Sequence, residues 1–127
     1  MMAANWLCSA TAQEVPWTFD CDEIRHVQAN DELTDFTITK DLKFEITFSR
    51  LSEDEWIMVG NSGTVPVVSM PGPGVIQFLE QTSFGTINYT QISLTPKDGS
   101  YSAVHSRHPV LIDTMFPSQW LLSCTGR

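Results

Sequence analysis

The sequence predicts an all-β, single-domain protein, an antiparallel meander of about eight or nine strands that closes as a β-barrel or a β-sandwich. Three observations lead to this fold class. Apolar and polar residues alternate over short runs, which is the pattern of half-buried strands. Seven glycines and seven prolines are spread along the chain and mark many turns. No segment shows the 3.6-residue apolar period of an amphipathic helix.

The size and composition of the chain fit one globular domain. The chain has 127 residues, of which 42% are hydrophobic. At this length folding removes roughly two-thirds of the unfolded surface from water, so a real core can form. Residues 13–127 are expected to form the β domain, without an internal repeat or linker.

The clearest strand is Leu42–Arg50, in which every second residue is apolar. Its apolar face consists of Leu42, Phe44, Ile46 and Phe48, and the residues between them are polar or charged. The other expected strands, in chain order, are Pro16–Cys21, Phe36–Thr39, Trp56–Gly60, Thr64–Met70, Gly74–Gln81, Phe84–Leu94, Ser100–His108 and Ser118–Thr125.

The segments between these strands are mostly short turns, which favours an up-and-down meander over a Greek key. The strongest turn signals are Gly60–Gly63, Pro71–Gly74 and Pro96–Gly99. The acidic stretch Asp22–Asp35 has no clear period and is predicted to be a surface loop, and Pro109–Pro117 is predicted to be a connection. Pro66 interrupts one strand, which is typical of an edge strand or a strand end.

The charge of the chain excludes several kinds of partner. Fifteen acidic residues against seven Lys and Arg give a formal net charge of −8, which favours solubility. A nucleic-acid-binding protein has a basic patch, and a protein drawn to anionic lipid has clusters of basic residues; the sequence has neither. No apolar run approaches the roughly 20 residues that span a bilayer. We therefore expect no nucleic acid and no membrane span.

Residues 1–12 are expected to be the remnant of a signal peptide. The segment is uncharged and ends in Ala10-Thr11-Ala12, and small residues at the first and third of these positions are what signal peptidase requires. The positive region and the full apolar stretch of a signal peptide are missing, so a disordered tail is the alternative. A signal peptide would place the start of the mature protein near Gln13 and the protein in the periplasm or outside the cell.

Three cysteines, Cys8, Cys21 and Cys124, bear on the compartment and on the closure of the fold. If cleavage removes Cys8, the other two are expected to pair in an oxidising compartment and to join the first strand to the last. If Cys8 stays, three pairings are open. The sequence has no C-x-x-C spacing, so a metal site built from these cysteines is not expected.

Two histidines, His105 and His108, are the candidate metal ligands. They are three residues apart in an expected strand, so their side chains point to opposite faces unless a bulge intervenes. We therefore expect one histidine to be buried and hydrogen-bonded, the other to be exposed, and no metal site. Arg107 shares a face with His105 and is expected to pair with an acidic neighbour such as Glu80.

No residue is assigned a catalytic role. Ser106 has histidine neighbours, and Asp98 or Asp113 could act as the acid of a triad. However, adjacent residues on a strand do not meet as nucleophile and base, and no G-x-S-x-G turn is present. Backbone amides of Gly60–Gly63 could hold an anion and the carboxylates of Asp22–Asp35 could hold Ca²⁺, but an ordinary turn and a solvated loop explain these two segments.

The large aromatic residues are expected to fill the core, and the same set could line a barrel that holds an apolar ligand. They are Trp6, Trp17, Trp56, Trp120, Phe44 and Phe48.

Five features of the chain form a further pattern. They are Gly60-Asn61-Ser62-Gly63, Val75–Glu80, Ala103–His108, Pro117–Trp120 and the near-terminal Cys124. Together they resemble a group of small exported bacterial proteins of unknown function, over most of residues 13–127. The resemblance implies a periplasmic, single-domain protein closed by a disulfide. It implies no activity and no catalytic residue.

The function expected from the sequence is non-enzymatic: binding of a small apolar ligand or of a protein partner by an exported β domain. The alternatives are a structural or assembly protein without a ligand, and a metal-dependent or hydrolytic enzyme that uses His105, Arg107 and His108. No cofactor is expected. An aromatic cavity inside a barrel would favour ligand binding, a filled core with an exposed apolar patch would favour assembly, and convergence of the two histidines would favour the enzyme.

Overall fold

The structure is a computed structural model, and it describes residues 15–30, 32–39, 43–61, 63–82, 85–108, 110–111, 114–115 and 117–127. The expected signal-peptide remnant, residues 1–12, lies outside the described residues. Cys8 and Trp6 lie in that segment, and Asp113 also falls outside the described part.

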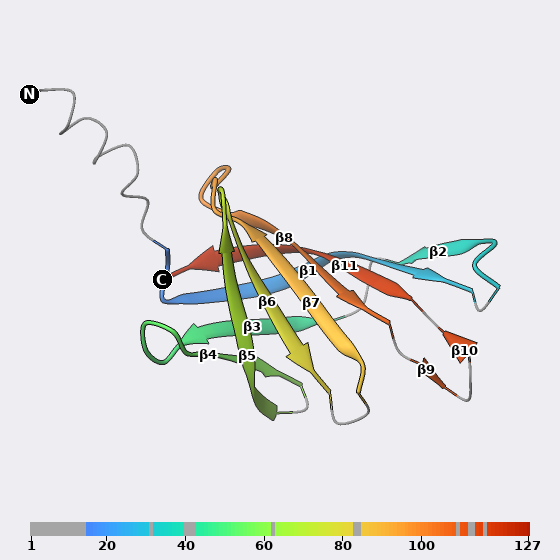
Figure 1. Ribbon diagram of the computed structural model, residues 1–127. Helices are drawn as coiled ribbons and strands as arrows, with labels where there is room; N and C mark the ends of the chain where they lie inside the picture. The colour runs from blue at the N-terminus through green and yellow to red at the C-terminus, as the bar shows by residue number, and fades with distance from the viewer. Residues whose placement is uncertain are drawn as a thin grey trace, which may run out of the picture.

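Eight antiparallel strands close into a barrel (Figure 1). They are β1 (Thr18–Ala29), β3 (Glu45–Arg50), β4 (Trp56–Gly60), β5 (Gly63–Gly72), β6 (Val75–Gln81), β7 (Ile87–Ser93), β8 (Tyr101–Arg107) and β11 (Ser118–Gly126). From β3 to β8 each strand pairs with the next in the chain, and β1 completes the ring by pairing with both β3 and β11. The predicted all-β meander is confirmed, and its closed form is the barrel.

Three further strands of the described part of the chain lie outside this ring. Strand β2 (Phe36–Thr39) pairs with the second half of β1, and β9 (Val110–Leu111) pairs with β10 (Thr114–Met115) as a separate two-stranded sheet. Both hairpins extend from the same side of the barrel, to the right in Figure 1. The segment Pro109–Pro117, predicted to be a plain connection, therefore contains a small hairpin.

Strand β1 corrects the prediction that Asp22–Asp35 is a loop. The strand continues to Ala29 because its second half forms ladders with β11 on one side and β2 on the other. Its register against β11 shifts between Glu23 and Arg25. Such a bulge changes which face each later side chain occupies, so the period of two breaks at this point. The bulge therefore removes the alternation that would have predicted this strand from the sequence, although the backbone pairing continues.

One half of the barrel interior is filled by aromatic side chains. Phe48 and Phe78 stack with their ring centroids 4.4 Å apart, and Trp56 packs against Phe78 at 4.9 Å. Phe19 adds contacts to Trp56 and to the edge of Tyr101. We name this part, between the β3–β4 and β7–β8 turns, the closed half. Trp17, expected in the core, is instead 57% exposed; it precedes β1, and its contact is with the guanidinium of Arg50, 5.1 Å from the ring centroid.

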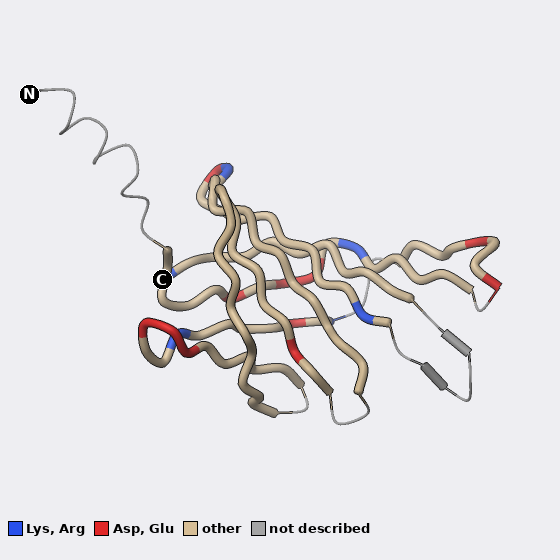
Figure 2. Tube along the Cα trace, in the orientation of Figure 1, with Lys and Arg blue, Asp and Glu red and all other residues tan. Residues whose placement is uncertain are grey.

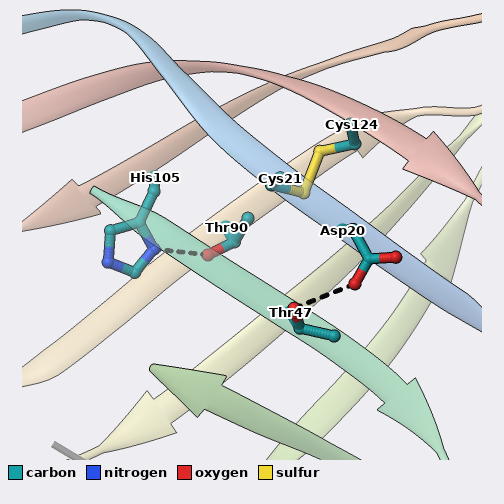
Figure 3. The surroundings of a disulfide bond; sticks show 6 residues. All are labelled: Asp20, Cys21, Thr47, Thr90, His105 and Cys124. Carbon is teal, nitrogen blue, oxygen red and sulfur yellow. Dashed lines mark hydrogen bonds between the residues drawn. A yellow bond between two sulfur atoms is a disulfide. The ribbon is translucent and has the colours of Figure 1, made fainter. Parts of the chain in front are cut away.

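A disulfide joins the first and last strands of the ring, as predicted. Cys21 on β1 and Cys124 on β11 are register partners, and both are buried (Figure 3). The bridge spans 103 positions of the sequence and lies at the seam where the barrel closes. A covalent link there keeps the two strands paired, since a meander otherwise closes through backbone hydrogen bonds alone.

Strands β5 and β6 separate at the other end of the barrel. They pair only from Val68 to Gly72 on β5, although β5 begins at Gly63. Pro66 lies in the part of β5 that pairs with β4 alone, in keeping with its predicted place at a strand end or edge, because proline has no N–H to donate. We name this end of the barrel the open half.

The charged residues are distributed mainly over turns and outer faces. Figure 2 shows acidic residues in the turn between β3 and β4 and near the tip of the β1–β2 hairpin. At the seam, Arg127 forms an ion pair with Asp20, with a distance of 2.9 Å between Nε and Oδ2. No helix of the described residues is long and apolar enough to cross a membrane.

Candidate functional site

A cavity of about 530 Å³ occupies the open half of the barrel. Its walls come from β3 to β8 and from the β4–β5 and β6–β7 turns. Apolar side chains cover one side: Phe44, Ile46, Met58 and Val65. Polar and charged side chains cover the other: Glu80, Gln81, Thr82, Thr86, Asn88 and Arg107. Asn61 lines the cavity from the β4–β5 turn. The cavity thus combines an apolar wall with a few polar groups, as ligand sites generally do.

The alternation of the strands explains how these side chains reach the interior. On β6, Ile76 and Phe78 are buried in the core, and Glu80 continues the same face into the cavity. On β8, His105 is buried and Arg107 follows two residues later. Because side chains two apart share a face of a strand, β6 and β8 change from apolar to polar as they reach the open half, whereas β3, β4 and β5 stay apolar there.

His105 is fully buried and has hydrogen bonds on both ring nitrogens. Its Nδ1 lies 2.6 Å from Thr90 Oγ1 (Figure 3), and its Nε2 lies 2.9 Å from Nε of Arg107. Arginine can only donate, so Nε2 accepts and Nδ1 carries the proton that is donated to Thr90. Burial, reinforced by the nearby positive charge of Arg107, lowers the pKa of His105 to about 3. The ring is therefore neutral at physiological pH.

Arg107 lies at the boundary between the closed half and the cavity. Its guanidinium carbon is 5.2 Å from the ring centroid of Phe44 and 5.1 Å from that of Trp120, within the range of cation–π attraction. Burial lowers the pKa of Arg107, and the negative charge of Glu80 opposes that change. The side chain is held from behind by a neutral histidine and two aromatic rings.

Glu80 faces the same cavity but has a different hydrogen-bond partner. Its Oε1 accepts a hydrogen bond of 2.7 Å from Nδ2 of Asn88. The expected ion pair between Arg107 and Glu80 is not formed, since no distance of 4.0 Å or less joins the charged groups of these two described residues; the negative charge of Glu80 only opposes the lowering of the pKa of Arg107. Among the described residues the ion pair within 4.0 Å is instead the one between Arg127 and Asp20.

An aromatic stack supports Arg107 from the side of β1 and β11. Trp120 is the register partner of both His26 and His105. It stacks on His26 at 4.3 Å and on Phe44 at 4.8 Å, measured between ring centroids. His26 is buried, and desolvation lowers its pKa in spite of the opposing effect of Glu23. The stack fixes the two rings on which the guanidinium lies.

The structure does not bring the candidate metal ligands together. His105 points into the barrel and His108 is exposed, as their spacing predicts. The described residues contain no group of three or more His, Cys, Asp or Glu side chains that could hold a metal ion.

The residues weighed for a hydrolytic triad are also apart. Ser106 lies on the opposite face of β8 from His105, with its Oγ 3.3 Å from Nε2 of Gln119. Asp98 occupies the β7–β8 turn, next to the closed half of the barrel. Asp113 falls outside the described residues. No triad forms among the residues in view.

Sequence reasoning missed several residues of the cavity, namely Met58, Thr82, Thr86 and Asn88. A signal for one of them, Asn88, existed in the strand pattern. Polar residues occupy inward positions of apolar faces at Glu80, Asn88, Thr90, His105 and Arg107. Such positions are expensive to fill with polar groups unless those groups are hydrogen-bonded or used. Turn residues such as Thr82 and Thr86 carry no such signal.

Comparison with known proteins adds no name to this geometry. No protein-family model, no curated protein and no solved structure matches the chain. The resemblance to small exported bacterial proteins therefore stays an expectation, as does location in the periplasm or outside the cell, with which the disulfide is compatible.

Proposed function

We propose that the protein binds a small, largely apolar ligand in the cavity of the open half. The observation that carries the proposal is the cavity of about 530 Å³, with Phe44, Ile46, Met58 and Val65 along one wall. Its volume falls within the range of small-molecule sites, roughly 300–1,000 Å³. An eight-stranded barrel is also just wide enough to hold one small ligand when side chains leave its interior unfilled.

The contrast between the two halves of the interior supports this proposal. The closed half is filled by aromatic side chains, as stability alone requires. The open half instead leaves the buried side chains of Ile46 and Met58 and the half-buried side chains of Phe44 and Val65 beside a space large enough for a ligand. A ligand that filled the space would remove apolar surface from water, which stabilises a complex by about 25 cal/mol per Å² of apolar area buried.

A second candidate is binding of a protein partner, and strand β2 is the observation in its favour. Its residues Phe36 and Ile38 are 62% and 58% exposed. Within the described part of the chain, β2 ends the sheet and pairs only with β1. An exposed strand edge with apolar side chains can accept a strand from another protein.

The ligand proposal is tested with N-phenyl-1-naphthylamine, a neutral apolar probe whose fluorescence rises on leaving water. We expect saturable binding to the protein and loss of that binding in Val65→Trp, where the larger side chain occupies the cavity. The matched control is Val68→Trp on the same strand, because Val68 is 62% exposed on the outer face. Equal binding by both folded variants would refute the cavity as the site. Native mass spectrometry of the same samples detects pairing between two copies of the chain, the form of the second candidate that the purified protein can show.

A further inference from the structure

The guanidinium of Arg107 is the charged group of the cavity whose hydrogen-bond donors are not all paired with described residues. Among the described residues, its Nε is the atom that makes a hydrogen bond, and the acceptor is the neutral ring of His105. The two Nη groups make no hydrogen bond to any described residue. They form one end of the planar fork with which arginine binds two oxygens at once.

The surroundings of Arg107 hold the side chain without neutralising it. The guanidinium lies on the rings of Phe44 and Trp120, and the hydrogen bond to His105 fixes the direction of Nε. A half-buried charge is costly unless it is paired. The acidic group that shares the cavity, Glu80, accepts its hydrogen bond from Asn88 instead. The arrangement orients the positive charge toward the cavity, where a bound ligand can supply the negative charge that pairs with it.

We infer that the ligand is an amphiphile with an anionic head group, which the two Nη groups of Arg107 bind while its apolar part lies along Phe44, Ile46, Met58 and Val65. The inference rests on the proposed function and adds the polarity and the direction of the ligand. The head group lies at the β8 side of the cavity, where Arg107 is, and the tail extends toward β4 and β5, which supply Met58 and Val65.

Glu80 makes the inference sharper, because its carboxylate lies in the same cavity and repels an anionic head group. In Glu80→Gln the repulsion disappears, while the amide oxygen of glutamine can still accept the hydrogen bond from Asn88. The affinity for an anionic amphiphile should therefore rise. A cationic amphiphile should lose affinity in the same variant.

The experiment measures displacement of N-phenyl-1-naphthylamine by three molecules with one tail: octanoate, 1-octanol and octylammonium. For the wild-type protein we expect octanoate to bind about tenfold to a hundredfold more tightly than octanol, the range for a hydrogen bond to a charged group. Arg107→Met should abolish that preference. Arg107→Lys should keep part of it, because the charge remains and the fork is lost.

Arg50→Met is the matched control. Arg50 also lies over aromatic rings, those of Trp17 and Trp56 at 5.1 and 5.8 Å, but does not line the cavity. The Arg50→Met variant removes one positive charge from the protein and should leave the preference for octanoate unchanged.

If octanol and octanoate bind the wild-type protein equally, or if the preference survives in folded Arg107→Met, the inference is overturned while ligand binding itself stands. If the probe does not bind at all, the proposed function fails first. Tighter binding of octanoate by Glu80→Gln supports the inference even if Arg107→Met does not fold.

Discussion

The closed and open halves of the barrel use the same strands for different purposes. In the closed half, Phe19, Phe48 and Phe78 are at most 1% exposed, and their rings contact other aromatic rings. In the open half, the same inward faces carry Glu80, Asn88 and Arg107 around a cavity. The difference teaches that one strand can contribute to a stable core at one end and to a binding site at the other. Phe78 and Glu80 are only two residues apart on β6.

The transition between the halves is a single row of side chains across the sheet. Trp120 is in register with His26 on one side and with His105 on the other, and His105 is in register with Thr90. These groups are buried or half-buried, but most are polar. Their hydrogen bonds and ring contacts connect the apolar core to the charged cavity.

The largest expected difference between the two halves is in the free energy of unfolding lost when a phenylalanine of each half is truncated. Phe78→Ala, in the closed half, should lower the free energy of unfolding by about 4 kcal/mol, because it removes a buried ring and leaves a void. Phe44→Ala, at the cavity, should cost about 1–2 kcal/mol, because one side of that ring already faces open space. Urea denaturation of both variants measures the difference. Equal losses would show that the open half is packed as tightly as the closed half.

Breaking the disulfide should have the next largest effect, and it should act on stability alone. Reduction of Cys21–Cys124 is expected to lower the free energy of unfolding by about 3 kcal/mol, since the bond closes a long loop in the unfolded chain. The melting temperature with and without reductant measures this. The double variant Cys21→Ala/Cys124→Ala is the control and should not respond to reductant. The affinity for the neutral probe should stay the same if the two halves are as distinct as the structure indicates.

The pH dependence of stability tests the row between the halves. The pKa of His105 is about 3 in the folded protein, against an ordinary value of 6.5. Because the folded pKa is depressed, the unfolded chain takes up the proton first. Stability is therefore full above pH 6.5 and falls as the pH drops toward 3. From pH 7 to pH 5 the loss attributable to His105 is about 2 kcal/mol.

Urea denaturation at both pH values, on the wild-type protein and on His105→Gln, isolates this contribution. Glutamine can donate to Thr90 and accept from Arg107 without titrating, so its profile should be flatter by the amount given above. His26 contributes a slope of the same sign to both proteins, because its pKa is also lowered. Identical slopes for the two proteins would mean that folding does not lower the pKa of His105.

Much of the fold could be predicted from local patterns, and particular residues show where this stopped. The alternation of Ile46 and Phe48 with polar residues predicts their strand, although the strand begins at Glu45, after Phe44. The burial of His105 with the exposure of His108 follows from their spacing of three. The second half of β1 could not be found in this way, because the bulge between Glu23 and Arg25 shifts the alternation. Trp17 appeared to belong to the core only because its position has the parity of Phe19 and Cys21.

The candidate site was visible in the sequence only as separate residues. Arg107 and Glu80 could be placed on inward faces, but they lie on different strands and reach one cavity because β6, β7 and β8 are neighbours in the ring. The cavity itself depends on where β5 parts from β6. Pro66 indicates that one edge of this strand is unpaired, but it gives neither the length of that edge nor the presence of a cavity beside it.

The sequence by itself determined that this protein is an antiparallel β meander, with one face of each strand apolar and with cysteines placed to join its first and last strands. These properties follow from local patterns and residue types: the period of two in the strands, the turn residues between them and the positions of the thiols. Only the tertiary structure decided that the sheet closes as a barrel, that one half is filled and the other open, and that a half-buried arginine faces the space. Closure depends on the pairing of β1 with β11 and on the summed volume of side chains from eight strands. No local pattern encodes that volume.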